Sequence, residues 1–321
     1  MTTINGWGSL PSVMRDVAGT RALHRILNRH DVPLSVLKAP HRRIPLVKMV
    51  RVFEAAARET GDYGLGQRIG AGTSVYDYGE WGAYAFGARN LKEGLHRLCR
   101  SIWVHESESR MFLCEREHHV VWSYATGLAG AEPSRQFYDH LLKPMLDFVR
   151  VYLGSAWEPD WLLMAKVKPK RHCGPEHGLC KQVRYEQPAF GVPIRRTELS
   201  SRKQASAPML LPVTSVDLLK HRPSSKDDFC SDVMEAIDLC LLAGSTDIGA
   251  TSRALDLGPR TLQRQLATQG VTFRDLLQQA RKRRALALLR ETDKSIMEIS
   301  HDLGYGDPEN FTRAFRGWQG I

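Results

Sequence analysis

The sequence predicts an α+β N-terminal domain followed by an all-α C-terminal domain with two helix-turn-helix motifs joined by a long helix. Three observations support this fold class. The first 200 residues mix helical apolar spacing with strand-like apolar runs, the pattern from residue 229 onward is almost wholly helical, and one helical pattern occurs there twice. We therefore expect domains at residues 1–200 and 229–321, with a linker at 201–228 that contains proline and serine.

The N-terminal domain is expected to combine helices with a small sheet. Two apolar runs, 111–114 and 120–124, are joined by a polar stretch and predict a β-hairpin. Further strands are expected at 161–167 and 190–194. Pro144 predicts a kink in the last helix of this domain. The expected helices share apolar residues at helical spacing and cover residues 13–29, 44–59, 91–104 and 135–153.

One helix-turn-helix pattern occupies the end of the chain. Ser295 and Glu298 fit a capping box at the start of its first helix. Gly304 suits the left-handed backbone that ends a helix, and Asp307 followed by Pro308 favours the start of the next helix. The inward-facing residues share helical spacing and are Ile296, Ile299, Ser300 and Leu303 in the first helix and Phe311, Ala314, Phe315 and Trp318 in the second.

The same pattern occurs once before, at residues 247–266. Ser252 corresponds to Ser300, and both are small residues at the position where two helices must cross closely. Asp256 takes the place of Gly304, and aspartate is one of the few other residues that tolerate left-handed backbone. The C-terminal domain is therefore predicted to be a tandem repeat of one motif.

A long helix is expected between the two motifs, from Thr272 to Thr292. About twenty helical residues span roughly 30 Å, which is close to the roughly 34 Å of one turn of B-DNA. In a helix-turn-helix motif the second helix lies in the major groove. The sequence therefore predicts that one chain places two recognition helices in successive major grooves of double-stranded DNA.

The C-terminal region resembles the DNA-binding domain of the AraC/XylS family of bacterial transcription regulators. The helix that contains Arg281, Ala285, Leu288 and Leu289 is similar to the linker helix of that family. The resemblance of the second motif is carried by Ile299, Leu303, Gly304, Tyr305, Asp307, Pro308, Phe311, Arg313, Ala314, Phe315, Trp318 and Gly320.

The N-terminal region resembles the arabinose-binding-type regulatory domain of the subgroup that includes ornithine-utilisation regulators. The stretches that carry this resemblance are 58–62 and 190–194. It implies that the N-terminal domain binds a small-molecule effector of unknown identity and forms a homodimer. The family resemblance also implies contact with RNA polymerase and activation of transcription.

Two features depart from the family pattern. Asp256 and Gly258 stand where the family more often has glycine and serine, so the first motif is expected to be less rigid. The chain ends at 320–321, where the family usually continues with a Ser-Pro-x-x-(Tyr/Phe)-Arg segment. We therefore expect the closing helix of the DNA-binding domain to be truncated.

The second helix of each motif is expected to contact bases. Arg264 and Arg313 can each pair bidentately with guanine, although an exposed helical arginine is usually only solvated. Gln263 or Asn310 can read adenine, and Glu309 either accepts from cytosine or repels phosphates. The predicted DNA-binding residues are Arg260, Thr261, Gln263, Arg264, Glu309, Asn310, Thr312 and Arg313, with Arg281 and Lys282 expected at phosphates.

Net charge does not by itself indicate DNA binding here. The chain carries +10, but the part from Asp227 onward carries −2 and the remainder +12. The N-terminal excess is consistent with an anionic effector, with long-range attraction to DNA, or with a solvated basic surface. The prediction of DNA binding therefore depends on the repeated motif.

Other classes of protein have little support in the sequence. No apolar stretch approaches the roughly eighteen residues of a membrane span, and the N-terminus lacks a secretory pattern, so we expect a cytoplasmic protein. The six cysteines are spread out and predict reduced thiols. No paired carboxylates or nucleophile–base set stand out, so we expect neither an enzyme nor a cofactor.

One alternative rests on residues 171–180. His172, Cys173, His177 and Cys180 are residue types that bind metals, but their spacing matches no common zinc pattern, and a polar loop is the simpler interpretation. A thiol or metal sensor, or an enzyme domain, fused to the same DNA-binding module is the alternative function. The glycines at 64, 66 and 70 resemble a dinucleotide loop only superficially, because no strand precedes them.

Overall fold

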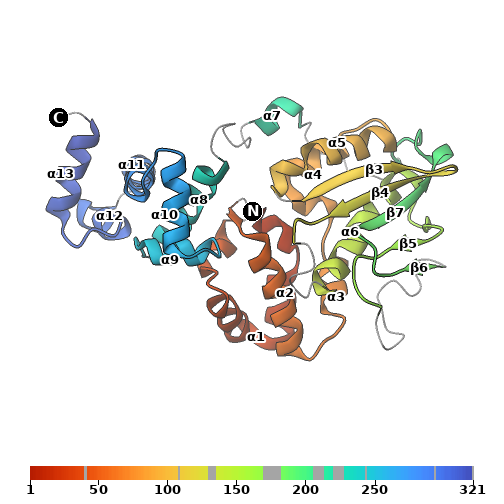
Figure 1. Ribbon diagram of the computed structural model, residues 1–321, viewed down its shortest axis with the longest axis horizontal. Helices are drawn as coiled ribbons and strands as arrows, with labels where there is room; N and C mark the ends of the chain where they lie inside the picture. Colours follow the sequence, from red (N-terminus) through yellow and green to blue (C-terminus); the bar gives the residue numbers. More distant parts are fainter. Residues whose placement is uncertain are drawn as a thin grey trace. The chain divides into compact units, whose positions relative to one another are not determined.

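The computed structural model divides the chain into two compact units (Figure 1). Residues 1–26 and 46–222 form unit 1, and residues 27–45 and 223–321 form unit 2. The predicted domain boundaries instead assign 27–45 to the N-terminal domain. The structure describes residues 1–39, 42–107, 109–128, 135–168, 182–204, 213–219, 228–242, 244–292 and 294–319.

Unit 1 contains a five-stranded sheet with the strand order β3-β4-β7-β5-β6. The predicted hairpin is confirmed, because β3 pairs antiparallel with β4 and Leu113 lies opposite Trp122. The strand β4 also pairs antiparallel with β7. The strands are β3 Arg110–Glu115, β4 His119–Ala125, β5 Leu162–Leu163, β6 Val183–Arg184 and β7 Phe190–Arg195, and short strands β1 Thr2–Thr3 and β2 Arg43–Ile44 lie elsewhere.

The helices of the N-terminal part follow the predicted pattern, with additions at α3 and α4 and with α7 in the predicted linker. The helix α1 bends at Gly19, whose φ of 81° is left-handed. Pro144 lies inside α6, which runs without a break over its predicted range. The helices are α1 Leu10–Arg29, α2 Leu46–Thr60, α3 Leu65–Ala71, α4 Gly79–Phe86, α5 Leu91–His105, α6 Arg135–Leu153 and α7 Ser215–Leu219, with 3-10 turns η1 Ile4–Trp7, η2 Leu34–Lys38, η3 Val75–Tyr78 and η4 Arg196–Glu198.

Two glycines let α3 approach the backbone of α6. A Cβ atom at Gly66 would lie 2.2 Å from the carbonyl oxygen of Gln136, and one at Gly70 would lie 2.5 Å from that of His140. The amide of Gly66 also donates to Oε1 of Gln136 at 2.7 Å. The glycine spacing that superficially resembles a dinucleotide loop therefore serves close helix packing, and it fixes the position of α6.

Unit 2 is helical throughout its described C-terminal part, as predicted. One apolar cluster includes Leu262, Leu266 and Leu276, and a second includes Ile299 and Phe311. No helix among the described residues is both long and apolar enough to cross a membrane. The helices are α8 Asp228–Leu242, α9 Ile248–Ala254, α10 Pro259–Thr268, α11 Phe273–Glu291, α12 Ile296–Asp302 and α13 Pro308–Gln319.

The segment 27–45 belongs to unit 2 because it packs against α8. Both η2 and β2 contact this helix, and Val36 is fully buried. The carboxylate of Asp238 on α8 accepts from Arg42 at 2.8 Å and from Arg283 on α11. One buried carboxylate thus joins the segment, α8 and α11.

We expect Asp238→Ala to destabilise unit 2 by about 1–3 kcal/mol, because it removes both ion pairs and leaves the half-buried Arg42 without its acceptor. Urea denaturation of the full chain measures the change. As a control, Asp302→Ala removes the more exposed pair with Lys294 and should cost less than about 1 kcal/mol. Equal losses in the two variants would contradict the role of Asp238.

Glu235 on α8 should make unit 2 less stable as the pH rises. Burial raises its pKa to about 7, against the opposing effect of Arg43. The folded chain therefore binds a proton that the unfolded chain releases above its ordinary pKa near 4.5, so stability is lost between about pH 4.5 and 7. Urea denaturation measures the free energy of unfolding. Between pH 4.5 and 8 this free energy should fall by on the order of 2–3 kcal/mol more in the native chain than in Glu235→Gln. If the free energy of unfolding changes with pH in the same way in the native chain and in Glu235→Gln, this expectation is contradicted.

Candidate functional site

The two predicted turns in unit 2 have the same backbone geometry. The amide of Leu257 donates to the carbonyl of Ser252 at 2.8 Å, and the amide of Tyr305 donates to that of Ser300 at 3.0 Å. The residue before each donor is left-handed, with φ of 58° at Asp256 and 69° at Gly304. The substitution of aspartate for glycine in the first motif therefore leaves the turn intact.

Small residues and local caps fix the helices around these turns. Ser252 and Ser300 are buried where the helices of each motif cross. The amide of Ser295 donates to Glu298 at 2.8 Å and the amide of Glu298 donates to Oγ of Ser295 at 3.3 Å, which confirms the predicted capping box. Asp307 accepts from the amide of Glu309 at 2.8 Å. In the second motif the start of each helix is thus held by a cap within its own sequence neighbourhood.

Polar side chains cover the open faces of α10 and α13. Leu262 and Phe311 anchor the inner faces of these helices. Among the described residues, neither Arg264 nor Arg313 forms an ion pair, so both guanidinium groups stay available. Of the predicted base-contacting residues, Arg260, Gln263, Arg264, Glu309, Asn310 and Arg313 are exposed, and Thr261 and Thr312 are half-buried.

The predicted phosphate contacts on α11 have other partners in the structure. Arg281 donates to the carbonyl oxygens of Leu303 and Gly304, at 2.9 and 3.1 Å, and its guanidinium lies 4.3 Å from the ring centre of Tyr305. Lys282 donates to the carbonyl of Trp318 at 2.8 Å. Both side chains therefore hold the second motif against α11. A phosphate contact from either one stays a prediction.

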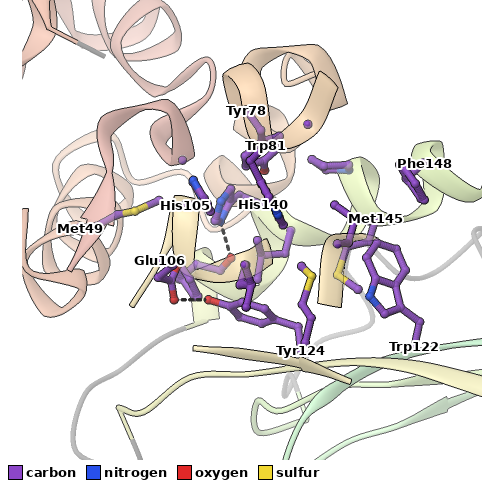
Figure 2. Close-up of a pocket in the computed structure, with 18 residues that line it drawn as sticks. Met49, Tyr78, Trp81, His105, Glu106, Trp122, Tyr124, His140, Met145 and Phe148 are labelled. Carbon is purple, nitrogen blue, oxygen red and sulfur yellow. Dashed lines mark hydrogen bonds between the residues drawn. The ribbon is translucent and has the colours of Figure 1, made fainter. Parts of the chain in front are cut away.

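A second candidate site is a pocket in unit 1 whose empty space, about 600 Å³, includes a part that is open to solvent. Figure 2 shows Trp122 and Tyr124 of the sheet on one side, and Trp81, His105 and His140 of the helices on the other. The rings of Trp81 and His105 stack in parallel with centres 5.0 Å apart. The cavity lies between α4, α5 and α6 and the strands β3 and β4, and most of its lining is aromatic or aliphatic.

The polar groups of this cavity form a small hydrogen-bonded set at one side. The hydroxyl of Tyr124 donates to Oε1 of Glu106 at 2.7 Å, and Ser109 donates to the same carboxylate. Burial raises the pKa of Tyr124, so its hydroxyl remains protonated. Burial also lowers the pKa of His140 to about 4, so this ring is neutral at pH 7. At neutral pH the carboxyl group of Glu106 is thus held by protein hydroxyls.

No pattern in the sequence indicates where an effector binds. Trp122 and Tyr124 alternate along β4 and therefore share one face, and Phe137, His140 and Met145 share one face of α6. These patterns are also those of an ordinary apolar core. Only the three-dimensional arrangement shows that a cavity lies between the two faces.

The residues behind the alternative function lie outside the described part of the chain. This applies to Cys173 and Cys180 with their neighbouring histidines. The described residues contain no group of three or more His, Cys, Asp and Glu that is suited to a metal ion. Cys99 is free, and burial raises its thiol pKa to about 12, so it is not a reactive thiolate.

Comparison with known proteins gives matches to both units. Residues 21–201 match the family described as the arabinose-binding domain of AraC transcription regulator, and residues 251–321 match a helix-turn-helix domain. The ornithine utilization regulator of Pseudomonas aeruginosa is 40% identical over 74 residues, which are 23% of this chain and 22% of that protein. The regulator VirS of Mycobacterium tuberculosis is 22% identical over 298 residues, which are 92% of this chain and 87% of that protein.

The relatives with the higher identities match only in part. This chain covers about a fifth of their length, 20% in the first of them. The crystal structure of the transcriptional regulator CdpR from Pseudomonas aeruginosa aligns with 94% of this chain and 95% of its own, at 19% identity and a TM-score of 0.42. The arabinose-binding-domain match covers more than half of the sequence. The chain therefore belongs to the AraC family of transcription regulators, with an N-terminal domain of the arabinose-binding type and a C-terminal helix-turn-helix domain.

Proposed function

We propose that this protein is a one-component activator that reads two successive major grooves and responds to a small molecule bound in the cavity of unit 1. The observation that carries the DNA-reading part is the pair of exposed helices α10 and α13. Each presents an arginine without an ion-pair partner among the described residues, opposite a buried apolar face. Such side chains are free to pair with base edges.

The length of α11 supports binding to successive grooves. Its 19 residues span about 28 Å, which is near the roughly 34 Å of one turn of B-DNA. One end of this helix packs in the apolar cluster of the first motif and the other end in that of the second. The length of α11 thus supports a spacing of the two recognition helices that is close to the repeat of the duplex.

The cavity supports the sensing part of the proposal. Its lining is mostly aromatic and aliphatic and includes a few convergent polar groups, which is the usual composition of a small-molecule site. In this proposal the protein is a homodimer that contacts RNA polymerase. A ligand that prefers one of two pre-existing states shifts their populations and thereby changes how the reading helices are presented.

Footprinting on DNA selected from a random library tests the proposal. We expect protection in two major grooves about one helical turn apart, on one face of the duplex, because α10 and α13 are joined by one helix. Protection of a single groove by each chain would contradict the two-groove arrangement. No protection of any selected sequence would contradict the DNA-reading function as a whole.

Arg313→Ala should lower affinity for the selected site by about 1–3 kcal/mol and relax the requirement for one base pair, because a bidentate contact with guanine is lost. Competition binding against all single-base variants of the site measures both effects. As a control, Arg290→Ala removes another exposed arginine near the end of α11 and should leave base preference unchanged. A uniform loss across all sequences for Arg313→Ala would place Arg313 at a phosphate instead.

A further inference from the structure

The hydrogen-bonding groups at one side of the cavity are already engaged with the protein. Glu106 accepts from Tyr124 and Ser109, as described above, and the Nδ1 atom of His105 lies 2.7 Å from the hydroxyl of Thr3. A ligand that competed for them would have to break bonds that are already made, so they are poor determinants of its chemistry.

Two indole groups on the cavity walls have no such partners. The Nε1 atoms of Trp81 and Trp122 are buried, and neither has a hydrogen-bond acceptor among the described residues. The whole side chains are also buried, with 5% and 1% exposed. Figure 2 shows both rings directed toward the space between the sheet and the helices. Indole nitrogen only donates, so an acceptor atom on a ligand in the pocket would give either group the partner that the described residues do not supply.

The charges of the lining restrict the ligand further. Among the described residues that line the cavity there is no lysine or arginine, and the carboxyl group of Glu106 is part of the wall. His140 is neutral at pH 7, because burial lowers its pKa to about 4. A carboxylate or phosphate in this cavity would lose its hydration without gaining a cation.

Sugars and amino acids fit this lining poorly. A monosaccharide carries several hydroxyl groups, and the aromatic and aliphatic walls would leave most of them without partners. An ammonium group offers only donors and would therefore leave the donors of Trp81 and Trp122 unpaired. The lining instead favours flat apolar surface together with one or two acceptor atoms.

We propose that the effector is a neutral, mostly apolar molecule with a carbonyl-type acceptor that Trp81 and Trp122 recognise. The proposal rests on the function proposed above, because it names the class of ligand for the same cavity. It differs from the sugar that the description of the matched family suggests. The recognition combines burial of ring surface with hydrogen bonds from the two indoles.

A series of probes on one two-ring scaffold tests the class of ligand with the full chain. Benzophenone is the neutral ketone, diphenylmethane lacks the acceptor, diphenylacetate is the anion and benzhydrylammonium is the cation. In calorimetric titrations at pH 7 we expect benzophenone to bind about three- to tenfold more tightly than diphenylmethane, which is the effect of one net hydrogen bond. Both ions should bind at least tenfold more weakly than benzophenone, and L-arabinose and L-ornithine should not bind in the same concentration range.

Tryptophan variants assign the hydrogen bonds. Trp122→Phe and Trp81→Phe each remove one N–H group but keep an aromatic ring, so at least one of them should bring the affinity ratio of benzophenone to diphenylmethane close to one. This ratio remains informative where a variant weakens both probes, because lost packing affects the two similarly. An unchanged ratio in both variants would overturn the role of the indoles.

A variant with a filled cavity shows whether benzophenone binds in the cavity or elsewhere on the chain. Met111→Trp on β3 adds bulk to a residue of the lining and should abolish benzophenone binding, whereas Phe112→Trp on the opposite face of the same strand should not. Tighter binding of an ion, a sugar or ornithine than of benzophenone, or no binding of benzophenone up to its solubility, would overturn the proposed class of ligand.

Footprinting in parallel separates this proposal from the function on which it rests. If L-arabinose or L-ornithine binds the native chain and Met111→Trp abolishes that binding, the class of ligand is wrong while the cavity remains the effector site. If benzophenone binds as expected and no DNA is protected, the ligand chemistry stands and the DNA-reading function fails.

Discussion

The DNA-reading unit depends on the packing of both ends of α11. Leu276 and Ala280 lie in the apolar cluster of the first motif, and Ala285 and Leu288 lie in that of the second. An α-helix has a fixed rise, so this packing sets the separation of α10 and α13. The hydrogen bonds of Arg281 to the turn of the second motif fix the rotation of that motif about the helix. The packing at both ends of α11 and the contacts of Arg281 therefore hold the two small motifs together as one rigid unit.

Features that depend on a few neighbouring residues were predictable from the sequence. The capping box of Ser295 and Glu298, the left-handed Asp256 and the hairpin of β3 and β4 all follow from local propensity or spacing. The cavity was not predictable, because its walls come from segments that are far apart in the chain. The same is true of Arg281, since a basic run on a helix does not show which carbonyl oxygens lie beside it.

Unit 2 also depends on residues that the sequence assigns to the other domain. Val36 and Arg42 lie between two stretches of unit 1, yet they pack on α8 and pair with Asp238. Asp238 also pairs with Arg283 of α11, the helix that spaces the reading helices. The spacing of apolar residues predicts whether a segment forms a helix or a strand, but it does not predict which other element the segment packs against. For this reason the domain boundaries expected from the sequence differ from those of the two compact units.

The positions of the acidic residues explain why the negative net charge of the C-terminal region is compatible with the proposed binding to DNA. Asp247, Asp275, Glu298 and Asp307 each accept from backbone amides at the start of a helix, where the dipole favours negative charge. Their charge is therefore partly compensated within the unit, and Asp238 is compensated by two arginines. The arginines on the open faces of α10 and α13 have no such compensation among the described residues. DNA responds to the local field at its phosphates, so a region with a balance of −2 can still present a cationic reading surface.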